Sequence, residues 1–477
     1  MTDTGRLAVS LGHRTRRTVH GSVDPAELWS ISQVDLVHVV MLVEQGLIDH
    51  RTGALLLRRI VELRDEEFAS LLELDRPRGL YLAYEDHLIS RLGTDVGGRL
   101  HTGRSRNDLK ATTTALALRS AVLELLGEGL RLLMVSLNRA RAHRDIIMPV
   151  YTHFQAAMPI TYGYYLLGIV LAAARDLEAT LRALDGLDRC PLGAGAVAGG
   201  DLPINPARTA ELLGFTGPPV HAIDSVASRD VLLRVVGALG GLGLTLGRLA
   251  TDLQLWSTAE FGFIHFPERL VGGSSAMPQK RNAFLLEHVK AKSAVVIGAW
   301  AGGAAATKST PFTNSIEVGT EAVHAAWPGL RAAAEAVQLC QVLVSGARPV
   351  AERMRDRAEA GYVVATSLAN RLVRAGVPFR EAHYRVGAAV RRAVERGSAT
   401  LDDPDLPFDA TDLDLATVIS AQDQGGGPGA FAAGFQAACT DTMALRQDLR
   451  AALARIAESN RRRESAVRGI MAGVDEG

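Results

Sequence analysis

Polar segments interrupt long Leu- and Ala-rich stretches of this sequence, and their residue types suit anion binding and proton transfer. They are HTGRSRND (101–108), YTHFQ (151–155), PLGAGAVAGG (191–200) and GGSSAMPQKRN (272–282). Each lies at or near the end of a stretch with helical periodicity. Helix ends carry unpaired backbone polar groups, so these segments are the first places to look for a site.

The segment HTGRSRND ends a loop and begins a helix. Free N–H groups at the helix start, Ser105 and Asn107 as donors, and Arg104 and Arg106 as cations would suit a carboxylate. A well-capped helix with solvent-facing arginines explains the same eight residues. On this segment alone, we favour the capped helix.

In the segment GGSSAMPQKRN, the two glycines at 272–273 give the backbone mobility and Pro278 makes it locally rigid. Ser274 adds a hydroxyl and Lys280 a cation. Such a loop could close over an anionic substrate. Its composition fits a flexible connection between helices equally well.

The remaining polar segments carry weaker signals. His153 stands beside the hydroxyl of Tyr151 and the amide of Gln155, and its charge can change near neutral pH. A lone histidine is more often structural than catalytic. The glycines of residues 191–200 lack GxGxxG spacing and no strand precedes them, so a phosphate loop is weakly indicated.

Helices must position these segments, because apolar residues recur at three- and four-residue spacing and β-branched alternation is nearly absent. Long helices are predicted from Asn107 to about Ala142, from Val226 to Glu260 and from about Ala283 to Lys308. Such helices need neighbours on several sides. A multi-helix bundle, completed by subunit association, is the economical interpretation, and a monomeric bundle is the alternative.

Composition excludes several classes of partner. The 52 basic residues balance the 52 acidic ones among 477, so nothing favours nucleic acid or a charged membrane surface. The three cysteines lack metal-ligand spacing, which fits a reducing compartment and no structural zinc. No apolar run suits a signal peptide or a spanning helix. We expect a cytoplasmic protein.

The segment GSSAMPQKRN contains the GSSxMPxKxN signature of the fumarase/aspartase superfamily in full. The matching positions are Gly273, Ser274, Ser275, Met277, Pro278, Lys280 and Asn282. HTGRSRND, MPVYTHFQAAMPIT, CPLGAGAVAGG, IDSVASRD and VPFREAH follow the order seen in argininosuccinate lyases. The resemblance therefore extends over most of the chain, from about residue 85 to 395.

The resemblance implies an all-α, three-domain protomer whose long central helices form a homotetrameric bundle, with each active site built from segments of three subunits. The expected domains are an N-terminal helical domain (1–104), a central long-helix bundle (105–350) and a C-terminal helical domain (351–477). The stretch 272–282 would be the family's mobile catalytic loop.

The family's reaction splits a succinyl-substituted amine, a dicarboxylate, into fumarate and the free amine. By position, Ser274 corresponds to the general base, and Lys280 and Asn282 would stabilise the enediolate formed when a proton leaves the carbon beside a carboxylate. His153 and Glu287 match the His–Glu pair near the departing nitrogen.

The resemblance also implies which residues bind the substrate. The positions that match are Ser105, Arg106, Asn107, Thr152, Gln155, Ser275, Met277 and Asn282. The role of Gln155 is the least defined of these. No metal site or nucleotide-binding motif is visible, and the chemistry needs no cofactor.

The half of the expected site that would bind the amine differs from that of argininosuccinate lyases. The family's tryptophan-Gly-Gly-Arg-Phe start is missing, and its acidic-Ile-His segment before the HTGRSRND loop is replaced by Arg78-Gly79-Leu80-Tyr81. A tyrosine, lysine and glutamine of the family fall, by ungapped count, on Asn314, Ile316 and Gly319. A site that leaves a guanidinium unpaired discriminates against it.

Three hypotheses follow. The favoured one is a carbon–nitrogen lyase acting on another N-succinyl amine, for which ethylenediamine-disuccinate lyase is a precedent within the group. Arg78 and Tyr81 could contact a further carboxylate on that amine. The second is a true argininosuccinate lyase, and the third is a catalytically silent tetramer resembling lens δ-crystallins.

Overall fold

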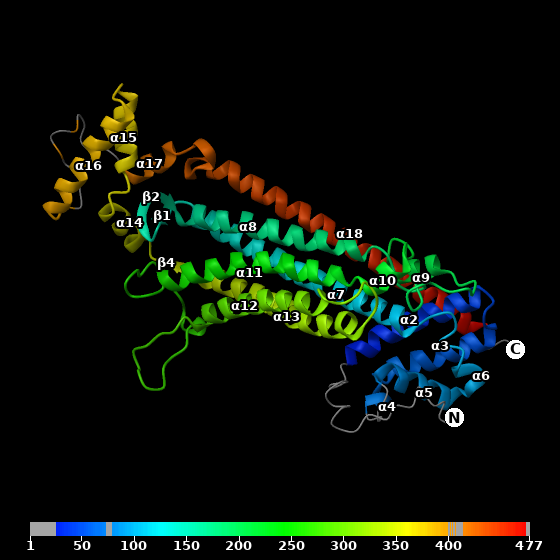
Figure 1. Ribbon diagram of the computed structural model, residues 1–477. Helices are drawn as coiled ribbons and strands as arrows, with labels where there is room; N and C mark the ends of the chain where they lie inside the picture. The colour runs from blue at the N-terminus through cyan, green and yellow to red at the C-terminus, as the bar shows by residue number, and fades with distance from the viewer. Residues whose placement is uncertain are drawn as a thin grey trace.

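Long helices lying side by side form the frame of the protomer (Figure 1). The computed structural model describes residues 25–72, 79–398, 401, 403, 406 and 414–473. The frame helices are α7 (Arg106–Ala142), α8 (Tyr162–Ala183), α11 (Asp230–Trp256), α12 (Phe284–Thr307), α13 (Ala322–Gly346) and α18 (Phe431–Ala472). The predicted all-α fold class is confirmed.

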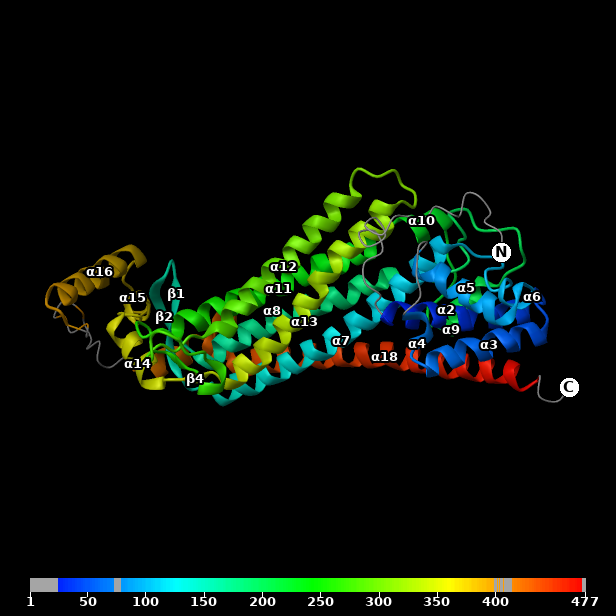
Figure 2. The same cartoon turned by 90° about the horizontal axis from the view of Figure 1, so that it is seen from below.

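Shorter helices gather at the two ends of this frame (Figures 1 and 2). One end carries α2 (Pro25–Glu44), α3 (His50–Asp65), α4 (Ala69–Leu72), α5 (Leu80–Leu92), α6 (Thr94–Gly97), α9 (Pro206–Leu213) and α10 (Ala222–Ala227). The other carries α14 (Ala351–Ala360), α15 (Ala365–Arg374), α16 (Phe379–Glu395) and α17 (Leu415–Ala421). We call them the α2 end and the hairpin end, the latter for the strands described next.

Two small antiparallel sheets complete the fold. They pair β1 (Ile147–Thr152) with β2 (Gln155–Thr161) and β3 (Ile264–His265) with β4 (Arg348–Pro349). The short single-turn segments are η1 (Leu184–Leu187), η2 (Glu268–Leu270), the π-helix η3 (Glu317–Glu321), η5 (Gln424–Gly426) and η6 (Pro428–Ala430). The sequence analysis predicted no hairpin, because prolines and polar residues obscure the alternation in β1 and β2.

The predicted long helices are found with small shifts. The first runs from Arg106 to Ala142 and the third from Phe284 to Thr307. The predicted helix from Val226 to Glu260 is wrong in one respect, since it is divided into α10 and α11. Arg229 lies between them in the left-handed region, with φ of 50°, and this conformation interrupts the helical hydrogen bonds.

The buried apolar residues described form one large cluster along the frame helices, a second at the α2 end and two small ones at the hairpin end. The second includes Leu116 of α7, Cys190, and Ile470 of α18, so distant parts of the chain share this core. The domain boundaries at residues 104 and 350 stay a prediction. The N-terminal 24 residues, in which no signal peptide was expected, lie outside the described residues.

Two of the described helices are long and apolar enough to cross a membrane by length and composition alone. They are residues 26–44 of α2, most of whose side chains are buried inside the protomer, and α11. Core helices of globular proteins commonly have such composition. The expectation of no membrane partner stays a prediction.

Candidate active site

The loop before α7 lies at the α2 end and leads into a capped helix start. Ser105 caps the helix: its Oγ accepts the N–H of Asn107 at 3.2 Å, and Asp108 Oδ1 accepts the N–H of Ser105 at 3.0 Å. This is the reciprocal capping box. Arg106 is exposed, so its cation is free to meet a ligand.

Asp108 joins two of the predicted polar segments. Its Oδ2 accepts the N–H groups of Gly193 and Gly195, each at 3.0 Å, and Asn107 Nδ2 donates to the carbonyl of Ala196 at 3.3 Å. Burial raises the pKa of Asp108, while these donors lower it. The glycine-rich segment therefore packs against the Ser105–Asn107 loop. Asp108 holds the two segments together, and the sequence analysis did not single it out.

The same loop is also held by a chain of polar contacts that begins at a buried ion pair. Arg104 forms an ion pair with Asp35 at 2.5 Å and donates to the Tyr81 hydroxyl at 2.9 Å. The Tyr81 hydroxyl in turn lies 2.9 Å from Nδ1 of His101. Because an arginine only donates, the Tyr81 hydroxyl accepts from Arg104, and its own O–H is left to donate to Nδ1 of the His101 tautomer that is protonated at Nε2.

This chain bears on the hypothesis for the amine pocket. The hydroxyl of Tyr81 already has two partners within the protein. Arg78, the other residue suggested for a further carboxylate, lies outside the described residues. The segment with Asn314, Ile316 and Gly319 lies at the same end of the frame, since Lys110 Nζ donates to Thr320 Oγ1 at 2.6 Å.

Thr152, His153 and Gln155 lie at the tip of the β1–β2 hairpin, at the opposite end of the frame. All three are exposed. His153 and Phe154 are the central turn residues, with φ of 51° and 60°. Within the described part of the chain, the imidazole of His153 has no hydrogen-bond partner, so it is available to a ligand or to another subunit.

The loop 272–282 is a closed ring at the hairpin end. Gly272 and Asn282 exchange two backbone hydrogen bonds of 2.8 Å, and Asn282 Nδ2 donates to the carbonyl of Gly273 at 3.2 Å. Arg281 is ion-paired with Glu268 at the base. Ser275, Met277 and Lys280 are exposed on the ring.

Ser274 has the most informative environment in this loop. Its Oγ accepts the N–H of Ala276 at 3.3 Å and the N–H of Met277 at 3.1 Å. Donors aimed at an oxygen favour its anionic form. The loop therefore holds two dipoles where an alkoxide would form.

Glu287 lies in the first turn of α12, and a residue of α11 holds it. Gln254 Nε2 donates to Glu287 Oε1 at 3.1 Å, and Gln254 Oε1 accepts from Lys290 Nζ at 2.5 Å. The sequence analysis missed Gln254, because nothing in the spacing of residues 254 and 287 signals their contact.

The structure brings the predicted residues into two groups. Ser105, Arg106 and Asn107 lie at the α2 end, whereas the hairpin, the ring and Glu287 lie at the hairpin end (Figure 1). Helix α7 separates them, and its 37 residues span roughly 55 Å at about 1.5 Å per residue. One protomer therefore does not bring the two groups to one substrate.

Comparison with known proteins identifies the family of this chain. Residues 82–298 match a family model described as lyase, and residues 362–421 match one described as argininosuccinate lyase C-terminal. The chain is 35% identical to argininosuccinate lyase of Methanothrix thermoacetophila over 460 residues, covering 93% of this chain and 92% of that one. The chain belongs to the argininosuccinate lyase family. It is a carbon–nitrogen lyase of the fumarase/aspartase superfamily.

Further relatives of this lyase span most of its length. Argininosuccinate lyase of Thermus thermophilus is 38% identical over 379 residues, covering 79% of this chain and 81% of that one. A solved structure of an EDDS lyase variant with bound fumarate is 28% identical with a TM-score of 0.85, covering 97% and 99% of the two chains. A class II fumarase from Schistosoma mansoni, 16% identical over 79% of this chain and 86% of that one, has a TM-score of 0.68 and shares the fold.

Proposed function

We propose that this lyase cleaves an N-succinyl amine or amino acid to fumarate and the free amine, or joins them in reverse, and that the amine differs from arginine. Family membership supports the reaction class. The likeness to EDDS lyase with bound fumarate supports fumarate as the dicarboxylate product. The exposed, apolar Ile316 in the segment proposed to meet the amine supports the altered pocket.

Ser274 is the proposed base. The hydroxyl loses its proton to solvent water, and the resulting alkoxide oxygen takes the proton from the carbon beside the succinyl carboxylate. The N–H groups of Ala276 and Met277 stabilise the alkoxide, and this contact is the observation that carries the mechanism. Lys280 and Asn282 stabilise the enediolate that forms. Collapse of this enediolate breaks the C–N bond.

His153 and Glu287 act at the departing nitrogen in this proposal. A carboxylate beside the imidazole favours its charged form, which can donate a proton to the leaving amine. Ser105, Arg106, Asn107, Thr152, Gln155 and Ser275 bind the succinyl carboxylates, and Met277 covers them. The glycines at the ring's base let it close over the substrate.

The proposed active unit is a homotetramer in the cytoplasm with sites shared between subunits. The separation between Ser105–Asn107 and the ring supports this assembly, because only another subunit can supply the missing group. The reaction as proposed uses no cofactor or metal. True argininosuccinate lyase activity is the second candidate, favoured by the 35–38% identity to curated argininosuccinate lyases.

Mass spectrometry decides between these candidates. The purified protein is incubated with fumarate and a pool of arginine, ornithine, diaminopropionate, ethylenediamine, aspartate and ammonia. An adduct with an amine other than arginine is expected. An arginine adduct would establish the second candidate instead.

The mechanism has its own test. Ser274→Ala should lower turnover by roughly a hundredfold to ten-thousandfold, the usual contribution of a general base, while the tetramer stays intact by light scattering. Ser420→Ala, an exposed position on α17, is the matched control and should leave turnover unchanged. Unchanged turnover in Ser274→Ala would refute the proposed base.

A further inference from the structure

An elongated groove lies between α7 and α18, away from every predicted site residue. Its volume is about 620 Å³, and its lining comes from residues 116–131 of α7, residues 449–463 of α18 and Gln33 of α2. The two helices are antiparallel here, because α7 begins and α18 ends at the α2 end (Figure 1). Leu123, Leu453 and Ile456 make much of the lining apolar.

Arg463 lies at the α2 end of this groove and is only 8% exposed. Its Nη1 is buried with no hydrogen-bond partner. Among the described residues, no carboxylate lies within ion-pair distance of its guanidinium. A buried arginine without a counterion is costly, since burial removes hydration that nothing else replaces.

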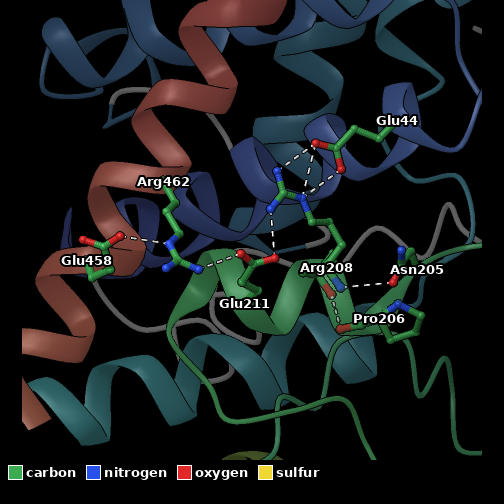
Figure 3. A network of polar contacts seen from close by, with 8 residues as sticks. Glu44, Asn205, Pro206, Arg208, Glu211, Glu458 and Arg462 are labelled. Atoms are coloured by element: carbon green, nitrogen blue, oxygen red, sulfur yellow. Dashed lines mark hydrogen bonds and ion pairs between the residues drawn. The ribbon is translucent and has the colours of Figure 1, made fainter.

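Carboxylates lie close to this turn of α18, because the two arginines that precede Arg463 are both ion-paired. Arg461 is ion-paired with Glu458, and Arg462 with both Glu458 and Glu211. The latter pairs belong to a network that continues through Arg208 to Glu44 (Figure 3). Arg463 alone of the three faces the groove and stays unpaired.

Two further arginines, both half-buried, add positive charge around Arg463. Arg119 lines the same end of the groove and donates to the carbonyls of Leu213 and Gly214, and Arg64 donates to Ser32 Oγ at 2.7 Å. Burial, together with repulsion by Arg463 and Arg455, lowers the pKa of Arg119 to about 10. Burial, then repulsion by Arg64, lowers the pKa of Arg463.

The carboxylates of the groove do not offset this charge. Glu128 accepts from Arg131 at 2.7 Å and from Gln341 at 2.9 Å, so its charge is already engaged. Glu124 also lines the groove and is exposed to solvent. The buried end is therefore cationic, whereas the middle is apolar.

We propose that this groove binds a small organic carboxylate, with its anionic head at Arg463 and a short alkyl chain along Leu123, Leu453 and Ile456. The head supplies the missing counterion, and the chain covers apolar surface that water now contacts. The site is separate from the proposed fumarate site and does not depend on the proposed function.

Isothermal titration calorimetry of the full-length protein tests this site, with octanoate as the probe. Acetate, which has the same carboxylate head group but lacks the long alkyl chain, is the control ligand. Octanoate should bind at least tenfold tighter than acetate, because only its chain reaches the apolar lining. Arg463→Met should abolish octanoate binding. Arg461→Met, which removes an exposed neighbouring arginine, should leave it unchanged.

Gly127→Leu tests the groove without touching Arg463. A Cβ added at Gly127 meets nothing within 4 Å, so the leucine should fill the groove without disturbing α7 and weaken octanoate at least tenfold. Arg463→Met should also raise the ligand-free thermal midpoint, since it removes an unpaired buried charge. Equal octanoate affinity in wild type and Arg463→Met, or no binding to wild type, would overturn the proposal.

Discussion

At the scale of single residues, the Ser105–Asn107 loop is supported by groups that are not among the proposed substrate-binding residues. Arg104, Tyr81 and His101 form one chain of donors and acceptors whose direction the arginine sets. Burial, followed by repulsion from Arg104 and Arg106, lowers the pKa of His101 to about 4. A neutral His101 is thus part of the folded loop at neutral pH.

The low pKa of His101 predicts an acid-dependent loss of stability. The unfolded chain binds this proton near pH 6.5 and the folded chain near pH 4, so the contribution of His101 is complete above pH 6.5 and is lost as pH falls toward 4. His101→Gln should unfold about 1 kcal/mol more easily at pH 7, because one hydrogen bond is weakened. The free energy of unfolding of the variant should then fall less steeply than that of wild type as the pH is lowered.

Denaturant melts of wild type and variant at pH 7.0, 6.0, 5.0 and 4.5 measure this difference. His50→Gln, at the exposed start of α3, is the control and should keep the wild-type slope. Parallel curves for wild type and His101→Gln would contradict the neutral imidazole in the Tyr81 chain.

Gln254 offers a second residue-scale prediction. Gln254→Leu keeps the volume of the side chain but removes the donor that holds Glu287. If Glu287 orients His153, kcat should fall roughly tenfold through misplacement, while KM changes little because Glu287 binds no carboxylate of the substrate.

Steady-state kinetics with the amine identified by mass spectrometry would measure this split. Gln341→Leu is the matched control, since Gln341 also holds a glutamate, Glu128, but one that is not among the proposed site residues. A rise in KM with unchanged kcat would assign Gln254 to binding instead of positioning.

At the scale of elements, the β1–β2 hairpin carries the proposed catalytic residue His153 on a strained turn. His153 and Phe154 both have positive φ, a conformation that costs a residue with a Cβ about 1–2 kcal/mol. Phe154 is 86% exposed, so contacts inside the protomer do not offset this cost. Such strain at a proposed site fits an imidazole held in one place by the turn.

Phe154→Gly should therefore stabilise the protein by about 1 kcal/mol, because glycine adopts positive φ without a Cβ clash. Phe154→Ala keeps the strained backbone and removes the ring, so it is the control and should give no gain. Thermal unfolding of the two variants beside wild type checks the prediction. Equal stabilisation by both would assign the effect to loss of the exposed ring.

At the scale of the whole molecule, the surface of the frame helices is as informative as the core. Leu244 on α11 and Val295, Ile297 and Trp300 on α12 are between 44% and 59% exposed. An exposed apolar face along long helices is typical of a subunit interface. This face agrees with the proposal that subunits share each site, because the 37 residues of α7 separate the two groups of proposed site residues within one protomer.

Mixing two inactive variants tests whether subunits share a site. Ser274→Ala and Asn107→Ala change opposite ends of the protomer. If each site takes these residues from different subunits, refolding an equimolar mixture should restore about a quarter of wild-type activity, since random assembly leaves that share of sites intact. Each variant refolded alone is the control. No recovery in mixed tetramers would place both residues in one subunit's site.

The sequence by itself determined the helical class, because three- and four-residue apolar spacing specifies which face of each helix is buried. It also singled out Ser274, Lys280, His153 and Ser105 as candidates, because their types and motif order are local properties of the chain. The break at Arg229 and the hairpin escaped it, since both arise from backbone conformations that the residue types do not announce.

Only the tertiary structure decided which distant groups meet. Gln254 reaches Glu287, Asp108 holds Gly193 and Gly195, and Arg463 remains unpaired beside a groove because α7, α11, α12 and α18 pack in one particular register. Contacts of this kind depend on relative positions of helices many residues apart. Periodicity along a chain specifies which face is buried, whereas three-dimensional packing decides which side chains touch.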